Sequence, residues 1–304
     1  MKLNVHHVTR YDYSLPVSRS VNRLRLLPST SAHQTLLSRR VDVRPEPGII
    51  DIGLDTWGNG IARFGIDAPH DSCRVSVMSL LDTRDETPPL PASLGVEENL
   101  ERLHADNRME ALMAHDCLLP SPYVPADRVV DALLGECPTE GRSVLEHAEA
   151  LMNHIYATFE YDPRFSTLVT PMSAVLGARR GVCQDFAHLA IAALRRAGVP
   201  ARYVSGYLET LPPPGQTKLR GADASHAWYS VYDAASGWHE FDPTNDKRPD
   251  AQYVVTAYGR DYGDVTPLKG MVYGGGKHTL SVQVDVDRVV DPTDALPDAL
   301  RSVS

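Results

Sequence analysis

Cys183 stands where its thiol could act as a nucleophile. It follows Arg179 and Arg180 and opens a run, residues 183–197, that contains no Gly or Pro and is rich in Ala, Leu, Ile and Phe. Gly198 stands at the expected end, so the pattern predicts a buried helix that begins at the cysteine. Unpaired backbone N–H groups and the helix dipole at such a start favour the thiolate. A free cysteine is often only a small buried hydrophobe, however, and catalysis also requires a base within reach.

A histidine and an aspartate stand at matching ends of a predicted β-hairpin. One β-rich strand begins at His226, residues 233–237 provide the turn, and the second strand ends at Asp242. The ends of antiparallel arms lie side by side, and a carboxylate beside a histidine can fix its tautomer and stabilise its charged form. With Cys183 placed across that end of the sheet, the set comprises a nucleophile, a base and an orienting carboxylate. The alternative is that His226 only begins a strand and Asp242 only caps a turn before Pro243.

Neighbouring polar residues are less suitable for these roles. His188 lies roughly 140° around the same helix from Cys183, which favours a packed core histidine. Asp185 in the first turn most simply favours the helix dipole. His239 precedes Asp242 by three strand positions, so it should lie on the opposite face of the strand. The remaining cysteines lack both a helix start and a His–Asp hairpin, and they are Cys73, Cys117 and Cys137.

The composition is typical of a globular protein of one large or two ordinary domains. The chain has 304 residues, of which 42% are hydrophobic and 23% charged. Its net charge of -9 argues against binding to nucleic acid. No apolar run reaches the roughly 18 residues of a membrane span, and the N-terminus lacks an apolar signal core. The four cysteines have no C-x-x-C spacing, so we expect no disulfide framework and a reducing, cytoplasmic setting.

No residue pattern indicates a metal or a cofactor, and we expect neither. Adjacent His6 and His7 would point to opposite faces of a strand, and no H-E-x-x-H motif is present. The run Gly274-Gly275-Gly276-Lys277 lacks the full spacing of a phosphate loop and precedes a strand, not a helix. These observations weigh against a metal hydrolase.

The elements that must position the candidate residues change in character along the chain. Period-two alternation predicts an antiparallel, sandwich-like β domain first, and a Pro-rich linker with a helical segment follows it. A core then begins near a capping-box helix start formed by Ser143 and Glu146, and a long loop over 211–224 could border its site. The predicted units are residues 1–85, 86–140, 141–290 and a polar tail over 291–304. The resulting fold class is α+β, with the nucleophile helix packed on an antiparallel sheet.

At these residues the sequence resembles the transglutaminase-like superfamily. The resemblance is strongest over 140–275, and the first 85 residues are similar to the β-rich N-terminal domain of bacterial members. The matching segments are Gly181-Val182-Cys183-Gln184-Asp185-Phe186-Ala187-His188-Leu189, Gly198-Val199-Pro200-Ala201-Arg202-Tyr203-Val204-Ser205-Gly206-Tyr207, Ser225-His226-Ala227-Trp228 and Gly237-Trp238-His239-Glu240-Phe241-Asp242-Pro243-Thr244. The resemblance implies a papain-like fold with Cys183 as nucleophile, His226 as base and Asp242 as orienter. Calcium control, as in animal members, is not supported because no EF-hand-type loop is present.

The function that we expect is thiol-dependent acyl transfer at the amide carbonyl of a peptide or protein, through a thioester. The backbone N–H of Cys183 and, as a candidate, the hydroxyl of Tyr161 would hold the oxyanion. Tyr203, Tyr207 and Trp228 are candidates to line an acyl channel, although aromatic residues on strands are usually core. Hydrolysis by a peptidase or amidase is favoured, because water needs no second binding site. The alternatives are protein-glutamine cross-linking and a non-catalytic module that binds peptides or assembles with a partner.

Overall fold

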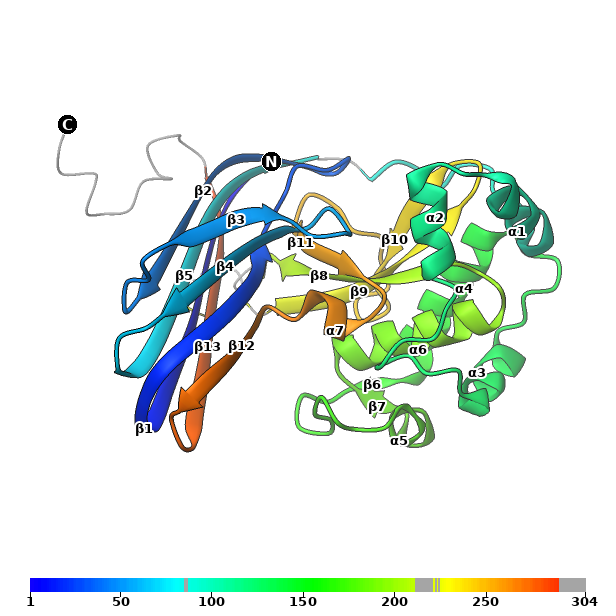
Figure 1. The fold of residues 1–304 in the computed structure, drawn as a ribbon. Coiled ribbons are helices and arrows are strands. Elements are labelled where there is room, and N and C mark those ends of the chain that lie inside the picture. Colours follow the sequence, from blue (N-terminus) through cyan, green and yellow to red (C-terminus); the bar gives the residue numbers. More distant parts are fainter. Residues whose placement is uncertain (85–86, 211–220, 222, 224, 290–304) are drawn as a thin grey trace, which may run out of the picture.

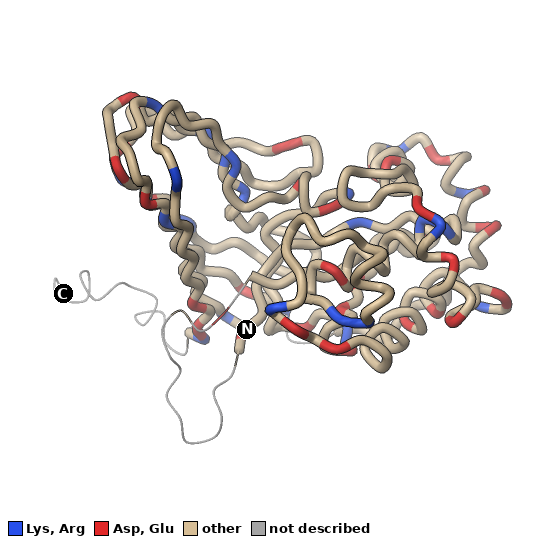
Figure 2. The backbone as a smooth tube through the Cα atoms, turned by 90° about the horizontal axis from the view of Figure 1, so that it is seen from below, with Lys and Arg blue, Asp and Glu red and all other residues tan. Residues whose placement is uncertain are grey.

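The computed structural model describes residues 1–84, 87–210, 221, 223 and 225–289. Figure 1 shows a curved β lobe beside a second lobe in which helices surround a smaller sheet. Most of the predicted loop over 211–224 and the tail predicted over 291–304 lie outside the described residues. No helix in the described part of the chain is long and apolar enough to cross a membrane. Acidic and basic residues are interspersed over both lobes in the view of Figure 2.

The N-terminal lobe is antiparallel, as predicted, and forms one seven-stranded sheet that curves around its long first strand. Its first five strands are β1 (Lys2–Leu27), β2 (Gln34–Arg44), β3 (Ile50–Leu54), β4 (Gly60–Ile66) and β5 (His70–Thr83). Alternate residues of β1, among them Leu3 and Val5, are buried while their neighbours are more exposed, as the period of a half-buried strand requires.

Two C-terminal strands return to this lobe, although the sequence placed them in the core predicted over 141–290. They are β12 (Leu268–Gly274) and β13 (His278–Arg288). The first half of β1 pairs with β5 on one edge and β13 on the other, and its second half pairs with β4 and β12. A strand of 26 residues has long edges on both sides, and the returning strands cover the edge that the first five strands leave open. The boundary after Val265 therefore separates the core from a continuation of the N-terminal sheet.

The second lobe consists of helices around a four-stranded antiparallel sheet in the order β10-β9-β8-β11. The sheet strands are β8 (Ala201–Leu208), β9 (Ser225–Asp233), β10 (Gly237–Phe241) and β11 (Tyr253–Gly259). A short parallel pair is formed by β6 (Glu160–Tyr161) and β7 (Arg180–Gly181). The helices are α1 (Val96–Ala105), α2 (Met109–Asp116), η1 (Arg128–Val130), α3 (Asp131–Glu136), α4 (Val144–Thr158), α5 (Met172–Ala178), α6 (Cys183–Arg196) and α7 (Tyr262–Val265).

The predicted central helix is α6, and it packs against β8 and β9 in the core of this lobe. Its apolar residues are almost all buried, which explains why the sequence pattern is apolar on most faces. The predicted capping box at Ser143 is confirmed: its hydroxyl accepts from the backbone N–H of Glu146, and Glu146 accepts from the backbone N–H of Ser143. The α+β class and the packing of a helix on an antiparallel sheet are confirmed.

Side-chain amides hold the two lobes together along β11. Gln34 donates to the carbonyl of Val255 at 2.8 Å and accepts from its N–H at 2.8 Å. Asn59 makes the same pair of bonds with the backbone of Tyr258, each at 2.7 Å. Each amide thus completes the hydrogen bonding of one buried backbone unit across the lobe boundary. These reciprocal bonds fix the N-terminal sheet relative to the core.

Candidate active site

Cys183 is the first residue of α6, and its neighbours fix the start of that helix. The backbone N–H of Val182 donates to a carboxylate oxygen of Asp185 at 2.9 Å, and the hydroxyl of Ser166 donates to the same oxygen. A Cβ at Gly181 would approach that oxygen to 2.9 Å, so glycine leaves the space that this contact needs. Asp185 therefore acts locally at the helix start, as predicted, and Cys183 presents its thiol from a rigid element.

His226 and Asp242 meet in a direct hydrogen bond. The ring Nε2 of His226 lies 2.7 Å from Oδ2 of Asp242, which is fully buried. The same Oδ2 accepts from the amide of Asn245 at 2.7 Å and from the hydroxyl of Tyr253 at 2.6 Å. The backbone N–H of Thr244 donates to Oδ1 at 2.9 Å. Four donors around one buried carboxylate are an environment in which it stays ionised.

The electrostatics of this pair keep both groups charged. Burial by itself lowers the pKa of His226, but the hydrogen bonds and charges of Asp242 and Cys183 outweigh it and raise the pKa to about 10. Burial by itself raises the pKa of Asp242, but the hydrogen bond and charge of His226, followed by Asn245 and Tyr253, lower it overall. Since Nε2 faces Asp242, Nδ1 is the ring nitrogen available to Cys183. Cys183, His226 and Asp242 therefore interact with one another through His226.

The other three cysteines have a different environment. Cys73, Cys117 and Cys137 are buried, whereas Cys183 is partly exposed. Desolvation raises the pKa of Cys73 and of Cys117 to about 11 each, and it also raises the pKa of Cys137. These thiols are held in the neutral form and away from reagents, as expected for cysteines that serve as small core residues.

A cleft of about 290 Å³ contains Cys183 and His226 and lies between the two lobes. On the core side it is lined by residues of α6, β8, β9 and α7. Its other wall belongs to the N-terminal sheet and consists of His7, Thr9, Tyr11, Pro267, Leu268, Leu280 and Val282. Leu280 and Val282 are about half exposed, at 51% and 48%, so this wall presents an uncovered apolar surface beside the cysteine.

The aromatic residues predicted to line an acyl channel divide into two groups. Tyr203 lines the cleft. Tyr207 and Trp228 are fully buried behind it. The hydroxyl of Tyr207 hydrogen-bonds Nδ1 of His7 at 2.8 Å, and the ring of Trp228 lies 5.8 Å from the ring of His226. Both support residues that line the cleft, since Tyr207 holds the ring of His7 and Trp228 lies beside that of His226.

Tyr161, the candidate oxyanion donor, lies beside the start of the nucleophile helix. It pairs with Gly181 in the short β6–β7 ladder and is 53% exposed. Partial burial and then the proximity of Cys183 raise its pKa, which keeps the hydroxyl protonated and able to donate.

The rejected candidates lie where the sequence placed them. His188 is buried and stacks on Tyr123, and its ring centre lies 4.9 Å from that of Tyr203. It accepts a hydrogen bond from the backbone N–H of Tyr262 at 3.2 Å, and burial lowers its pKa to about 4. His239 bonds Ser236 at 2.9 Å, away from the His–Asp pair. The prediction of a core histidine at position 188 is confirmed.

Potential metal ligands are scattered in the part of the chain that the structure describes. No group of three or more His, Cys, Asp or Glu residues in that part of the chain could hold a metal ion. His6 and His7 point apart, as expected: His6 bonds Ser76 at 2.9 Å, whereas His7 bonds Thr9 at 2.9 Å.

Sequence reasoning missed three parts of the site. Asn245 follows Asp242 by three residues, and this short spacing could have suggested a turn that returns its amide to the carboxylate. Tyr253 comes from β11, a separate strand of the sheet, and carries no local signal. The wall contributed by Leu280 and Val282 depends on a strand pairing that no short pattern could reveal.

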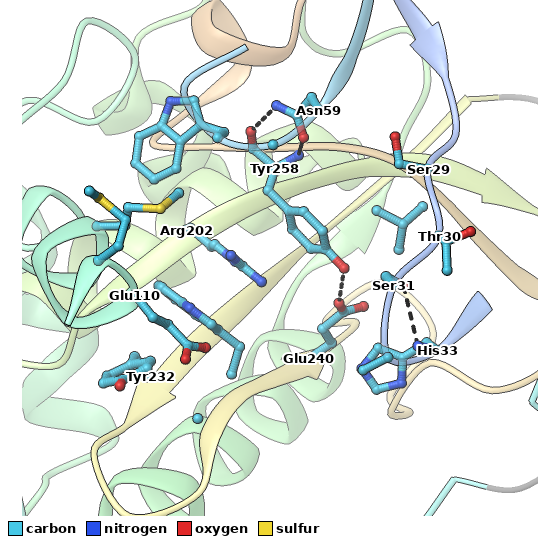
Figure 3. A pocket seen from close by; sticks show the side chains of 18 of the residues that line it. Ser29, Thr30, Ser31, His33, Asn59, Glu110, Arg202, Tyr232, Glu240 and Tyr258 are labelled. Atoms are coloured by element: carbon cyan, nitrogen blue, oxygen red, sulfur yellow. Dashed lines mark hydrogen bonds between the residues drawn. The ribbon is translucent and has the colours of Figure 1, made fainter. Parts of the chain in front are cut away.

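A larger cavity, about 810 Å³, also lies between the lobes, but it contains none of the three candidate residues (Figure 3). We place the chemistry in the smaller cleft, since of these two cavities it is the one that contains a partly exposed thiol and a charged histidine.

A cysteine at a helix start, with a histidine–aspartate pair on the adjacent antiparallel sheet, defines the class of papain-like α+β proteins. Two family models match within this class: the bacterial transglutaminase-like N-terminal region over residues 3–82, and the transglutaminase-like superfamily over residues 131–243. An uncharacterized protein of Mycobacterium tuberculosis strain H37Rv is 36% identical over 299 residues, which cover 97% of this chain and 95% of the relative. The chain therefore belongs to the transglutaminase-like superfamily, whose members are cysteine enzymes.

Further comparisons agree with the fold. An uncharacterized protein of Mycobacterium leprae is 32% identical over 291 residues, covering 95% of this chain and 99% of that protein. A protein-glutamine gamma-glutamyltransferase of Pseudomonas aeruginosa is 31% identical over 119 residues, covering 36% of this chain and 18% of that enzyme. The crystal structure of a candidate cysteine protease from Cytophaga hutchinsonii superposes with a TM-score of 0.69 at 23% identity, covering 96% of this chain and 93% of that one. That structure shows that both lobes recur together.

Proposed function

We propose that this protein is a thiol-dependent enzyme that cleaves amide bonds, with Cys183 as nucleophile, His226 as general base and acid, and Asp242 as orienting carboxylate. The observation that carries the proposal is the 2.7 Å bond between His226 and the buried Asp242, with the partly exposed Cys183 in the same cleft. A charged imidazole beside a thiol stabilises the thiolate, which is the attacking form.

The reaction proceeds in two halves. The Cys183 thiolate forms a bond to the amide carbonyl carbon, and the carbonyl electron pair moves to oxygen. When that pair returns, the C–N bond breaks, and His226 gives its proton to the leaving amine. The acyl group then remains on sulfur as a thioester. In the second half His226 takes a proton from water, the hydroxide attacks the thioester, and the thiolate is released with a carboxylic acid.

The oxyanion requires donors that already point at it. The backbone N–H of Cys183 belongs to the first turn of α6 and so has no carbonyl partner within that helix. The hydroxyl of Tyr161, beside Gly181, is the second donor in this proposal. Donors fixed before reaction stabilise the charge without reorganisation, and each typically contributes about 2.7–4 kcal/mol to the transition state.

The cleft suggests the class of substrate. Its two walls belong to different lobes, and the N-terminal wall presents apolar side chains, including Leu280 and Val282, beside Cys183. We propose that the substrate is a peptide or protein amide whose acyl side carries an apolar side chain. Such a group would remove these half-exposed residues from water, at about 25 cal/mol per Å² of apolar surface buried.

Hydrolysis is the outcome that we favour, because water needs no binding site of its own. Acyl transfer to an amine is the second candidate. The partial match to a protein-glutamine gamma-glutamyltransferase supports it, and that match is confined to 36% of this chain. The two outcomes differ only in whether water or an amine attacks the thioester.

The cytoplasmic setting rests on the four free cysteines and stays a prediction.

Selective alkylation tests the proposal. Iodoacetamide near neutral pH should modify Cys183 stoichiometrically and leave the three buried thiols unmodified, as peptide mapping by mass spectrometry would show. His226→Ala should slow the modification at least about tenfold, because the thiolate loses its charged partner. His154→Ala is the matched control, since His154 pairs with Glu136 on the surface and should leave the rate unchanged.

The same variants separate the enzyme from its alternatives. Cleavage of a peptide amide should disappear in Cys183→Ala, and an acyl adduct on Cys183 should be detectable by mass during turnover of wild-type protein. Adding a primary amine and identifying the product distinguishes transfer from hydrolysis. Equal labelling of all four thiols, or an unchanged rate in His226→Ala, would instead support a non-catalytic peptide-binding module.

A further inference from the structure

The larger cavity lies on the face of the core sheet that is turned away from α6. On β8, Tyr203 packs with the residues of α6, so the adjacent Arg202 points to the other face and lines this cavity. The remaining walls come from the loop over 29–34, the turn over 57–59, helix α2 and strands β9 to β11. Its volume of about 810 Å³ is in the range of small-molecule sites, which often lie between domains.

Arg202 is held rigidly inside the cavity. Its guanidinium carbon lies 3.9 Å from the ring centre of Trp238 and 3.9 Å from the ring centre of Tyr258, so the group is stacked between two aromatic faces. Figure 3 shows Arg202 beside Tyr258 and Glu240 in this space. A guanidinium fixed in this way keeps its planar set of donors in place before any ligand arrives.

The donors of this guanidinium have no acceptor in the described part of the chain. Among the residues that the structure describes, none accepts a hydrogen bond from Arg202, and its Nε is shielded without a partner. A carboxylate that lines the same cavity is already engaged: Glu240 accepts from Nε1 of Trp228 at 2.8 Å and from the hydroxyl of Tyr258 at 3.0 Å. A shielded cation without hydrogen-bond partners is costly, so an anionic ligand would satisfy it.

We propose that this cavity binds a small organic carboxylate with a flat, apolar body. A carboxylate matches the planar guanidinium in a two-pronged geometry, and the indole rings of Trp57 and Trp238 line the space around it. Glu110 and Glu240 border the same cavity. These two carboxylates repel a doubly charged phosphate more strongly than a singly charged carboxylate. The cavity therefore favours a carboxylate over a phosphate as its ligand.

A matched pair of probes tests this site. N-acetylphenylalanine and N-acetylphenylalaninamide differ only in whether a carboxylate or a neutral amide stands at one end. The acid should bind at least tenfold more tightly by isothermal titration calorimetry. Two of the three tryptophans line the cavity, so the acid should also change the tryptophan fluorescence, whereas inorganic phosphate should not. Alkylation of Cys183 beforehand should leave binding unchanged, which separates this test from that of the proposed enzyme.

Charge variants give effects of opposite sign. Arg202→Met should reduce binding of the acid at least tenfold, and circular dichroism shows whether this variant folds. Glu110→Gln lies at an exposed position and should fold normally; it should bind the acid a few-fold more tightly, because one repulsive charge is removed. Arg102→Met is the matched control, since Arg102 pairs with Glu98 at 2.6 Å on α1 and does not line the cavity, so this variant should not affect binding.

Several results would overturn the proposal. These are equal affinity for the acid and the amide, no binding of either, or undiminished binding in a folded Arg202→Met variant. A Glu110→Gln variant that binds the acid no better than wild type would also contradict it.

Discussion

At the scale of single residues, the properties of the site depend on how Asp242 is surrounded. Three side chains and one backbone group donate to its carboxylate, and the carboxylate in turn holds His226. A base near a nucleophile is useful only if its tautomer and charge are fixed, and a buried carboxylate on the far ring nitrogen fixes both. His226 is therefore a group that is charged at neutral pH and ready to release its proton to a leaving amine.

Removing the charge of Asp242 should shift the pH dependence of the reaction. The pKa of His226 is raised to about 10, so His226 carries its proton at neutral pH and loses it only on the alkaline side. Amide cleavage in wild-type protein should therefore decline as the pH rises toward that value. In Asp242→Asn the alkaline decline should move to lower pH by about 1–3 units, because an adjacent opposite charge shifts a pKa by that amount. A pH–kcat profile measures it.

The same shift has a consequence for stability with a definite sign. Because the folded-state pKa of His226 lies above the ordinary value of 6.5, its contribution to folding is fully present below 6.5 and is lost as the pH rises toward about 10.

Asp250→Asn is the matched control for the pH–kcat profile, since Asp250 pairs with Lys247 on the same segment and should leave the alkaline decline of kcat in place. An identical alkaline limb in wild type and Asp242→Asn would contradict the role given to this carboxylate.

At the scale of elements, strand β8 separates two functional faces. Its residues alternate between the α6 side, where Tyr203 lines the catalytic cleft, and the opposite side, where Arg202 lines the larger cavity. Gly206 pairs with His226 on the neighbouring strand. A Cβ at Gly206 would lie 2.5 Å from the ring of Trp228 and 2.1 Å from the carbonyl oxygen of Val254. Glycine is required here by close approach, not by backbone conformation.

Gly206→Ala should therefore disturb both the fold and the site. Overpacking of a core typically costs about 1–3 kcal/mol, and a clash with a backbone carbonyl places this substitution toward the upper end. Displacement of Trp228 should also lower activity, since its ring lies 5.8 Å from that of His226. Urea unfolding and the rate of Cys183 alkylation measure the two effects.

Gly53→Ala supplies the comparison for that experiment. Gly53 lies in β3, and a Cβ there would meet nothing within 4 Å. Its stability should change by less than about 1 kcal/mol and its alkylation rate should not change. If the two alanine variants behaved alike, the steric explanation for Gly206 would fail.

At the scale of the whole molecule, the catalytic cleft is completed by the N-terminal lobe. Strand β13 pairs with the first half of β1, and together they place Tyr11, Leu280 and Val282 opposite Cys183. The reciprocal amide bonds of Gln34 and Asn59 to β11 hold this wall in position. The N-terminal lobe therefore contributes to the choice of substrate in the function proposed above.

A charge on this wall should impair substrates with apolar acyl groups. Leu280→Lys places an ammonium group at a half-exposed position, so the fold should tolerate it. The kcat/KM for a peptide with an apolar acyl side should fall by about 10–200-fold, the range of one lost apolar contact in a pocket. Alkylation by iodoacetamide, which is too small to reach the wall, should be unchanged.

Met271→Lys tests whether any charge on this sheet has the same effect. Met271 is 65% exposed on β12 and does not line the cleft. This variant should retain the wild-type kcat/KM. Equal losses in the two lysine variants would indicate a general electrostatic effect, and no loss in Leu280→Lys would remove the wall from substrate selection.

The local features of this protein follow from its sequence. The helix that begins at Cys183, the capping box at Ser143, and the hairpin that places His226 near Asp242 are all visible within short segments. Each depends on periodicity, end signals or a turn of a few residues, and such short-range preferences determine structure before any tertiary contact forms. The α+β class and the candidate residues could therefore be predicted.

Only the tertiary structure decided which distant segments meet. Leu3 pairs with Arg288 across nearly the whole chain, and this pairing gives the N-terminal lobe its last strands and the cleft its second wall. Alternation in a strand shows which side chains share a face, but it does not name the partner strand, because many strands present the same pattern. The hydrogen bond from Tyr253 to Asp242 and the aromatic stack on Arg202 arise in the same way, from packing between elements that carry no matching local signal.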